Sequence, residues 1–157
     1  MKKETIYASV TKNQKTAISI IRVSGSKVQK ISKTLFKKEP VKNNVNIRNI
    51  FSLNGDFIDQ GIVLLFLKPN SPTGEDLLEF QVHGSFSIIR KIEEELEKIK
   101  GVREAQPGEF TKRSFYNKKM DLLQVEGLED LLDSSTDLQR KQAQLLLMGS
   151  VLSLIHI

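Results

Sequence analysis

The sequence predicts an α+β fold: a mixed-sheet domain with helices, followed by a partial helical arm. In the first two thirds of the chain, β-branched apolar segments alternate with amphipathic segments, which is typical of mixed strand and helix domains. Asn54-Gly55 joins two of the apolar segments, and this dipeptide is the strongest short signal for a β-hairpin. From Asp121 onward, leucine and valine recur at helical spacing instead. We therefore expect an α/β domain at 1–118 and the start of a truncated helical domain at 119–157.

Six segments are typical of strands, because β-branched and aromatic residues run through them between turn formers. The segment "TAISIIRVSG" is nearly all apolar, which favours a strand covered on both faces. The strands are expected, in chain order, at 5–10, 16–25, 47–53, 57–68, 77–84 and 102–106.

Three segments have the periodicity of amphipathic helices. Residues 26–38 carry apolar side chains three and four positions apart and a basic outer face. In 85–101, isoleucine and leucine line one side until Gly101, which ends the helix. Asp121 followed by Gln124 is a capping-box signature, and it starts the helical arm. Residues 149–157 are uncharged and end this pattern abruptly, so we expect a fragment whose partner helices are missing.

Composition limits the chemistry of the 157-residue chain. There is no cysteine, and the two histidines, His83 and His156, have no ligand spacing, so we expect no catalytic nucleophile and no metal site. The sequence contains no GxxxxGK[ST] phosphate loop, so nucleotide binding of that kind is not expected. No apolar run suits a membrane span or a signal peptide, which predicts a cytoplasmic protein without membrane contact.

The net charge of +5 is unevenly distributed. Residues 1–50 hold twelve Lys and Arg against two acids, 51–100 hold five against nine, and 101–157 hold seven against eight. A basic first third attracts RNA or another anionic ligand. A lysine-rich solvated surface has the same composition, and the low aromatic content of 6% favours that second interpretation.

The strand expected at 77–84 carries a possible polar site. Side chains alternate between the two faces of a strand. One face holds the apolar residues Leu78, Phe80 and Val82. The other holds Glu79, Gln81 and His83. Three hydrogen-bonding groups in a row suit a polar ligand, but an ordinary solvent-facing strand has the same pattern, so both interpretations stay open.

Arg22 and the stretch 107–127 add candidates. Arg22 lies near the end of an apolar strand, where an unpaired buried charge would cost several kcal/mol. Its partner is expected to be Glu79, Glu109 or a ligand anion. The stretch "PGEFTKRSFYNKKMDLLQVEG" combines Glu109 with four cations before a helix start. It fits a solvated surface helix, and equally a loop that presents charged groups to a ligand.

Three motifs, in order and with matching spacing, resemble one family. They are "ISIIRVSG" (18–25), "PNSPTGEDLLEFQVHG" (69–84) and "PGEFTKRSFYNKKMDLLQVEGLEDLLDSS" (107–135). The family is that of the tRNA-modification GTPases MnmE/TrmE, and the resemblance runs from about residue 4 to residue 148. It implies an N-terminal domain similar to the tetrahydrofolate-binding domains of aminomethyltransferases, which binds a one-carbon folate and forms a homodimer. It also implies a central helical domain that a Ras-like G domain interrupts.

The resemblance implies the following function. With an FAD-dependent partner protein of the MnmG/GidA type, the family adds a carboxymethylaminomethyl or aminomethyl group to the wobble uridine of tRNA. GTP, Mg²⁺ and K⁺ belong to the G domain, which this sequence lacks. The implied cofactor is 5-formyl- or 5,10-methylene-tetrahydrofolate. The implied folate contacts fall on Arg22, Glu79 and Lys119.

The sequence departs from the family in three places and leaves two alternatives. The loop "VTKNQKTA" lacks the proline and glycines of the family's early loop, the G domain and the C-terminal cysteine motif are missing, and the tail "GSVLSLIHI" keeps little of the charged family helix. One alternative is a stand-alone folate-dependent enzyme similar to aminomethyltransferases. The other is a basic RNA-binding module that needs no pocket.

Overall fold

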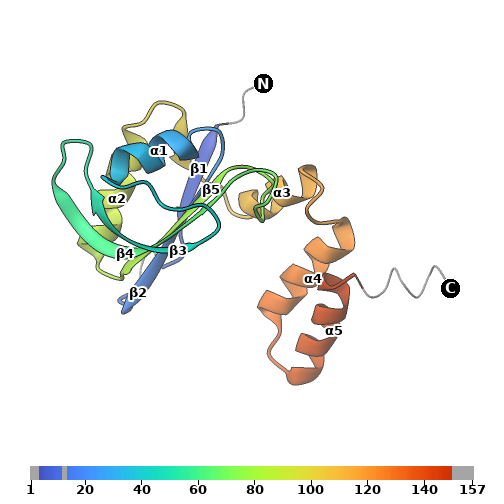
Figure 1. Ribbon diagram of the computed structural model, residues 1–157. Coiled ribbons are helices and arrows are strands. Elements are labelled where there is room, and N and C mark those ends of the chain that lie inside the picture. The colour runs from blue at the N-terminus through green and yellow to red at the C-terminus, as the bar shows by residue number, and fades with distance from the viewer. Residues whose placement is uncertain (1–3, 12–13, 150–157) are drawn as a thin grey trace. The chain divides into compact units, whose positions relative to one another are not determined.

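The computed structural model describes residues 4–11 and 14–149, which form two compact units divided between Phe110 and Thr111 (Figure 1). The first unit is a six-stranded sheet with the strand order β3-β4-β5-β2-β1-β6. Neighbouring strands are antiparallel except β1 and β6, which are parallel. The predicted α+β class with a mixed sheet is therefore confirmed, whereas the domain boundary at 118/119 stays a prediction. The strands are β1 Thr5–Ser9, β2 Ile18–Ser24, β3 Val45–Phe51, β4 Phe57–Phe66, β5 Leu77–His83 and β6 Val102–Glu104.

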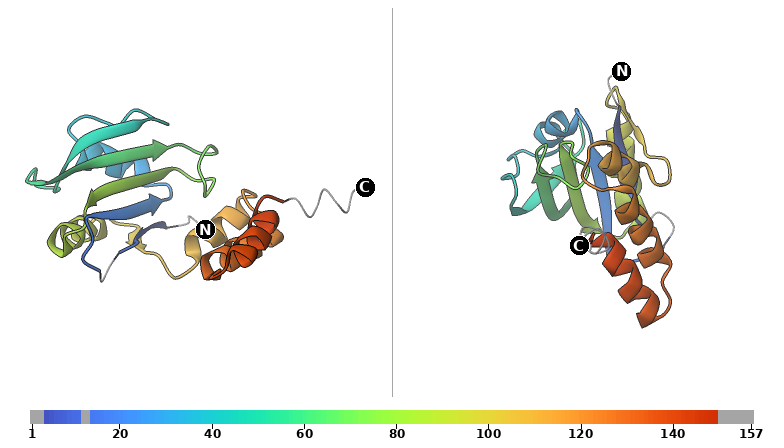
Figure 2. Two further views of the ribbon diagram at one scale, coloured as in Figure 1. Left: turned by 90° about the horizontal axis from the view of Figure 1, so that it is seen from below. Right: turned by 90° about the vertical axis from the view of Figure 1, so that its right-hand side faces the viewer.

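Two helices of the first unit pack against the same face of the sheet. They are α1 (Val28–Leu35) and α2 (Phe86–Glu97), and the left view of Figure 2 shows α1 behind the strands. Their apolar sides join the inward residues of the central strands in one buried core. This core supplies most of the hydrophobic stabilisation, because burying one such side chain contributes roughly 1.5–3 kcal/mol. Its members include Ile21, Val23, Val28, Ile31, Leu35, Val63, Leu65, Leu78, Phe80, Val82, Ile92 and Leu96.

The opposite face of the sheet is open. Ile18 on β2 is 64% exposed and Ile47 on β3 is 66% exposed. No helix of the described first unit joins its apolar side to these residues, since both helices belong to the core on the inner face. The expectation that the strand within 16–25 is covered on both faces is therefore wrong. Ile18 and Ile20 are apolar residues that face outward, but α1 and α2 both cross the other side of the strand.

The second unit is helical. It contains α4 (Leu122–Asp133) and α5 (Asp137–Leu147), while α3 (Glu109–Tyr116) crosses the division between the units. The capping box of Asp121 and Gln124 is confirmed. A second capping box, of Thr136 and Gln139, starts α5. Of the two interpretations of 107–127, the structure has a helix over Glu109–Tyr116. Of the uncharged C-terminal residues 149–157, only Gly149 is among the described residues.

A buried carboxylate joins α2 to the connection between β3 and β4. Glu95, whose side chain is 1% exposed, accepts hydrogen bonds from the Leu53 N–H at 2.8 Å and from Lys98 Nζ at 2.6 Å. Lys91 Nζ lies 3.0 Å from the same carboxylate. Burial acts to raise the pKa of Glu95, but the bonds from Lys98, Leu53 and Lys91 outweigh it and lower the pKa to about 2. The hairpin end is thus fixed to the helix by a charged group that stays ionised.

Glu95→Gln is expected to lower the free energy of unfolding at neutral pH by on the order of 3 kcal/mol. Because the folded-state pKa of Glu95 lies below its ordinary value of 4.5, its contribution is present above about pH 4.5 and is lost as the pH falls toward about 2. Urea unfolding of both proteins between pH 2 and 7 measures this, and the difference should shrink to nothing near pH 2. Glu94→Gln, at a half-exposed site on the same helix, is the control and should change little. A difference that does not depend on pH contradicts the prediction.

Gly127 allows the close packing of α4 on α5. A Cβ atom at this position would lie 2.6 Å from the Leu147 nitrogen and 2.8 Å from the Leu146 Cβ. Gly127→Ala should therefore separate the two helices and destabilise the second unit by about 1–3 kcal/mol, although alanine favours helix. Amide exchange across α4 and α5 measures this. Glu129→Ala, at an exposed site of α4, is the control. Unchanged protection in Gly127→Ala would show that the helices can move apart without cost.

Candidate functional site

Arg22 and Glu79 form an ion pair on the open face of the sheet. The antiparallel register of β2 and β5 places them directly opposite each other. Arg22 Nε and Nη2 donate to Glu79 Oε2 at 3.1 and 2.9 Å. Of the expected partners of Arg22, Glu79 is the one that the structure provides. Glu109 instead accepts two bonds from Arg103, at 2.7 and 2.9 Å.

The pair keeps hydrogen-bonding capacity that it does not use. Both bonds from Arg22 go to one oxygen of Glu79, and the other oxygen, Oε1, has only a 3.5 Å contact with Gln81 Nε2. Arg22 Nη1 donates no hydrogen bond to any of the described residues. The Arg22 side chain is 42% exposed and the Glu79 side chain 11% exposed. A ligand that reaches this face thus meets an ionised acceptor and a charged donor side by side.

A shallow apolar hollow adjoins the pair on the sheet. It has a volume of about 240 Å³ and is lined by Ile18, Ile47, Gly61, Ile62 and Gln81, among others. Gln81 lies opposite Ile20 on β2 and opposite Ile62 on β4, so it connects the hollow to the polar pair. Apolar walls with a few convergent polar groups are typical of small-molecule sites.

A polar loop fixes the ends of β2 and β5 beside the pair. The Ser24 hydroxyl bonds to the Thr73 hydroxyl at 2.8 Å and donates to Glu75 Oε2 at 2.9 Å. Asp76 accepts from Gln29 Nε2 at 2.7 Å and from the Lys68 N–H at 2.9 Å. In the sequence, 69–76 is part of the motif "PNSPTGEDLLEFQVHG", but no role in holding these strand ends was predicted for it. The available signal was the cluster of hydroxyl and carboxyl residues directly before a strand.

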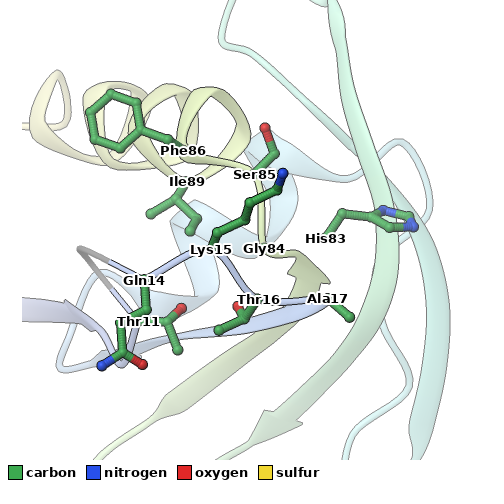
Figure 3. A pocket seen from close by; sticks show the side chains of 10 residues that line it. All are labelled: Thr11, Gln14, Lys15, Thr16, Ala17, His83, Gly84, Ser85, Phe86 and Ile89. Atoms are coloured by element: carbon green, nitrogen blue, oxygen red, sulfur yellow. The ribbon is translucent and has the colours of Figure 1, made fainter.

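His83 does not join Glu79 and Gln81. Its Nδ1 lies 2.9 Å from Asp59 Oδ1 on β4, and its backbone N–H donates to Asp59 Oδ2 at 2.9 Å. His83 also borders a hollow of about 720 Å³ that is lined by Thr11, residues 14–17 and the start of α2. Figure 3 shows that the His83 ring points away from this hollow. We therefore assign the His83 side chain neither to the polar site of Glu79 and Gln81 nor to this hollow. The other lining residues of the hollow are Thr11, Gln14, Lys15, Thr16, Ala17, Gly84, Ser85, Phe86 and Ile89.

The third sequence candidate, Lys119, belongs to the second unit. It is exposed in the turn between α3 and α4, and its N–H donates to the Ser114 carbonyl at 2.8 Å. The preceding residue, Lys118, has a positive φ of 58° that shapes this turn. The structure thus brings together two of the three candidates, Arg22 and Glu79, within the first unit.

The described part of the chain contains neither a cluster of metal ligands nor a membrane-spanning helix. No group of three or more histidine, aspartate or glutamate residues in it is arranged to hold a metal ion. Every helix in it is too short or too polar to cross a bilayer.

Comparisons with known proteins agree with each other. The family model described as "GTP-binding protein TrmE N-terminus" matches residues 5–119. The chain is 44% identical over 140 residues to the "tRNA modification GTPase MnmE" of Dinoroseobacter shibae, covering 89% of this chain and 33% of that protein. It is 41% identical over 157 residues to "tRNA modification GTPase gtpbp3, mitochondrial" of Dictyostelium discoideum, covering 95% and 31%. The chain thus spans about a third of the length of these relatives.

Proposed function

Because this chain belongs to the TrmE N-terminus family, we propose that it is the folate-binding and dimerising region of a tRNA-modifying GTPase. The observation that carries the proposal is the Arg22–Glu79 pair, with an unused acceptor and an unused donor on an open sheet face. Arg22 and Glu79 are also two of the three residues on which the family resemblance places folate contacts. Lys119 is the third proposed contact.

The chemistry of a one-carbon folate fits these groups. The pterin ring presents adjacent N–H donors, and the Glu79 carboxylate can accept them in parallel. The glutamate tail of the folate is anionic and suits the Arg22 guanidinium or the Lys119 ammonium. Ile18 and Ile62 line the hollow that Gln81 connects to the pair, and they offer apolar contact to a flat ring. The proposed ligand is 5-formyl- or 5,10-methylene-tetrahydrofolate, bound by this chain's own side chains.

The exposed apolar side chains of the open face support the proposed homodimer. Ile18 and Ile47 are each about two thirds exposed, and Val45 is 72% exposed. Contiguous exposed apolar residues on a sheet are typical of protein interaction sites. A two-fold dimer would bring two copies of the same face together. We propose that the first unit, and not the helical arm, supplies this contact.

The remaining functions concern the whole protein. We propose that it modifies the wobble uridine of tRNA together with an FAD-dependent partner, in the cytoplasm. GTP with Mg²⁺ and K⁺ would bind in a part of the relatives that this chain does not span. The stand-alone aminomethyltransferase-like alternative has no observation specifically in its favour.

Glu79→Gln is expected to weaken binding of 5-formyl-tetrahydrofolate about ten- to a hundredfold, because a charge-assisted bond worth roughly 1.5–3 kcal/mol is lost and an acceptor becomes a donor. Isothermal titration calorimetry measures the Kd. The fold should lose less than about 1 kcal/mol, since the Arg22 side chain that pairs with Glu79 is half-exposed. Glu94→Gln, on α2, removes a charge elsewhere and should leave the Kd unchanged. Equal affinity of Glu79→Gln and the parent would remove Glu79 from the proposed site.

Ile18→Lys is expected to shift the chain from dimer to monomer, because a charged ammonium would have to be buried in the proposed interface. Sedimentation velocity at low and high micromolar concentrations measures this. Leu132→Lys, at an exposed apolar site of α4, is the control and should remain dimeric. A parent chain that is monomeric at high micromolar concentration would contradict the proposed dimer. If the Leu132→Lys variant is monomeric while Ile18→Lys stays dimeric, the contact does not involve the first unit.

A further inference from the structure

Exposed cations gather on the outer side of α1 and the turn after it. Lys30, Lys33, Lys37 and Lys38 are exposed, and no ion pair among the described residues involves any of them. Lys30 and Lys33 are three residues apart within the helix and so point to the same side. In contrast, Lys91 and Lys98 on α2 are paired with Glu95. The uneven charge of the sequence thus becomes a local concentration of unneutralised charge.

Arg48 on the edge strand β3 extends this charge. Its Nε donates to the Lys38 carbonyl at 3.0 Å, and its Nη2 donates to Asn46 Oδ1 at 3.0 Å. Its Nη1 donates to the Ile47 carbonyl at 2.9 Å. All these acceptors are neutral, so the positive charge of the guanidinium is not cancelled. The bond to the Lys38 carbonyl fixes the turn that carries Lys37 and Lys38 against β3. We call Lys30, Lys33, Lys37, Lys38 and Arg48 the basic face.

Aromatic rings adjoin the basic face. Lys37, Lys38 and Arg48 line a hollow of about 280 Å³ together with Phe51 and the amides of Asn49 and Gln60. Lys37 Nζ lies 4.3 Å from the centroid of the Phe51 ring. Phe51 meets Phe57 edge to face, with the ring centroids 6.1 Å apart. Phe57 is 61% exposed, so one ring next to the cations is open to solvent. Figure 1 shows α1 and the β3–β4 pair in the same part of the first unit.

Few carboxylates oppose these charges. Glu39 follows Lys38 in the chain, and Asp56 precedes Phe57. Glu95 approaches from α2, but it is buried and already bonded to two lysines. Five cations therefore stand against two exposed acids, and the surface keeps a net positive charge at neutral pH.

We propose that the basic face binds RNA, with phosphates at Lys37, Lys38 and Arg48 and an unpaired base stacked on Phe57. Phosphate contacts need unneutralised cations, and a base needs an exposed aromatic ring beside them. The partner of this chemistry is tRNA, and this choice of partner rests on the proposed function. An acidic lipid surface would use the cations but would not need an ordered ring beside a polar hollow.

The test uses the full chain and an unmodified tRNA transcript with a fluorescent label, titrated by anisotropy at several KCl concentrations. The variant Lys37→Glu with Lys38→Glu is compared with Lys68→Glu plus Lys100→Glu. Both pairs change the net charge from +5 to +1. Lys68 and Lys100 are exposed, follow β4 and precede β6 respectively, and do not line the hollow that Lys37, Lys38 and Arg48 form. The comparison therefore separates a local site from overall charge.

The first variant should bind the tRNA at least about tenfold more weakly than the parent, and the control pair should differ by less than about threefold. The slope of log K against log salt should fall by about 1.4–1.8 in the first variant, because two phosphate contacts are lost. If both pairs lose affinity equally, or neither does, the proposal is overturned. Binding to anionic phosphatidylserine vesicles with no binding to tRNA overturns it as well.

Phe57→Leu tests the stacking separately. It should weaken binding of a labelled single-stranded RNA oligonucleotide by about fivefold or more while leaving the salt slope unchanged, because stacking releases no counterions. Unchanged affinity would remove the base contact. If the charge-reversal variant does not fold by circular dichroism, Lys37→Gln with Lys38→Gln must still show at least threefold weaker tRNA binding. Folate affinity, measured in the same variants, should stay at the parent value, so the folate and RNA proposals fail independently.

Discussion

The antiparallel register between β2 and β5 is the constraint on which the rest of the first unit depends. It pairs Arg22 with Glu79 and, on the opposite face, directs Ile21 and Phe80 into the core. A slip of one residue would exchange the faces of a strand and bury a charge without a partner. The core and the polar pair are thus two consequences of one register. The buried hydroxyls of Ser24 and Thr73 hold that register at the end of the strands.

The sequence was sufficient to predict those elements whose structure depends on side-chain alternation or on short local motifs. The β-hairpin, the apolar side of β5 and the Asp121 capping box follow from residues close together in the chain, and the structure has all three. The candidate partners of Arg22 could also be named, because a charge near an apolar strand end requires a partner. The choice between Glu79 and Glu109 could not be made, because it depends on β5 pairing with β2 and on the position of α3, which no local pattern contains. Glu109 pairs instead with Arg103, which lies only six residues before it in the chain.

Other features depend on tertiary contacts that no local pattern contains. The strand at Ile18–Ser24 is apolar on both sides, yet only one side is covered, because the chain returns both helices across the same face. The basic face needs the turn after α1 to meet β3, and Arg48 joins them by donating to the backbone carbonyls of Lys38 and Glu39. Low overall aromatic content favoured a merely solvated lysine surface. The structure places two of the few rings, Phe51 and Phe57, beside those lysines.

The basic face also restricts how two copies can associate. A strand at the edge of a sheet can pair with the same strand of another copy, and β3 is such an edge. Two copies joined along β3 would bring Arg48 and its neighbouring lysines against their own equivalents, and this like-charge contact opposes association. The other edge, β6, has only three residues. The open face, with Ile18 and Val45 exposed and the Arg22–Glu79 pair internally neutral, carries no such opposition. Charge at the edge and apolar surface on the face therefore favour placing the proposed dimer contact on the side of the sheet that also holds the proposed folate contacts.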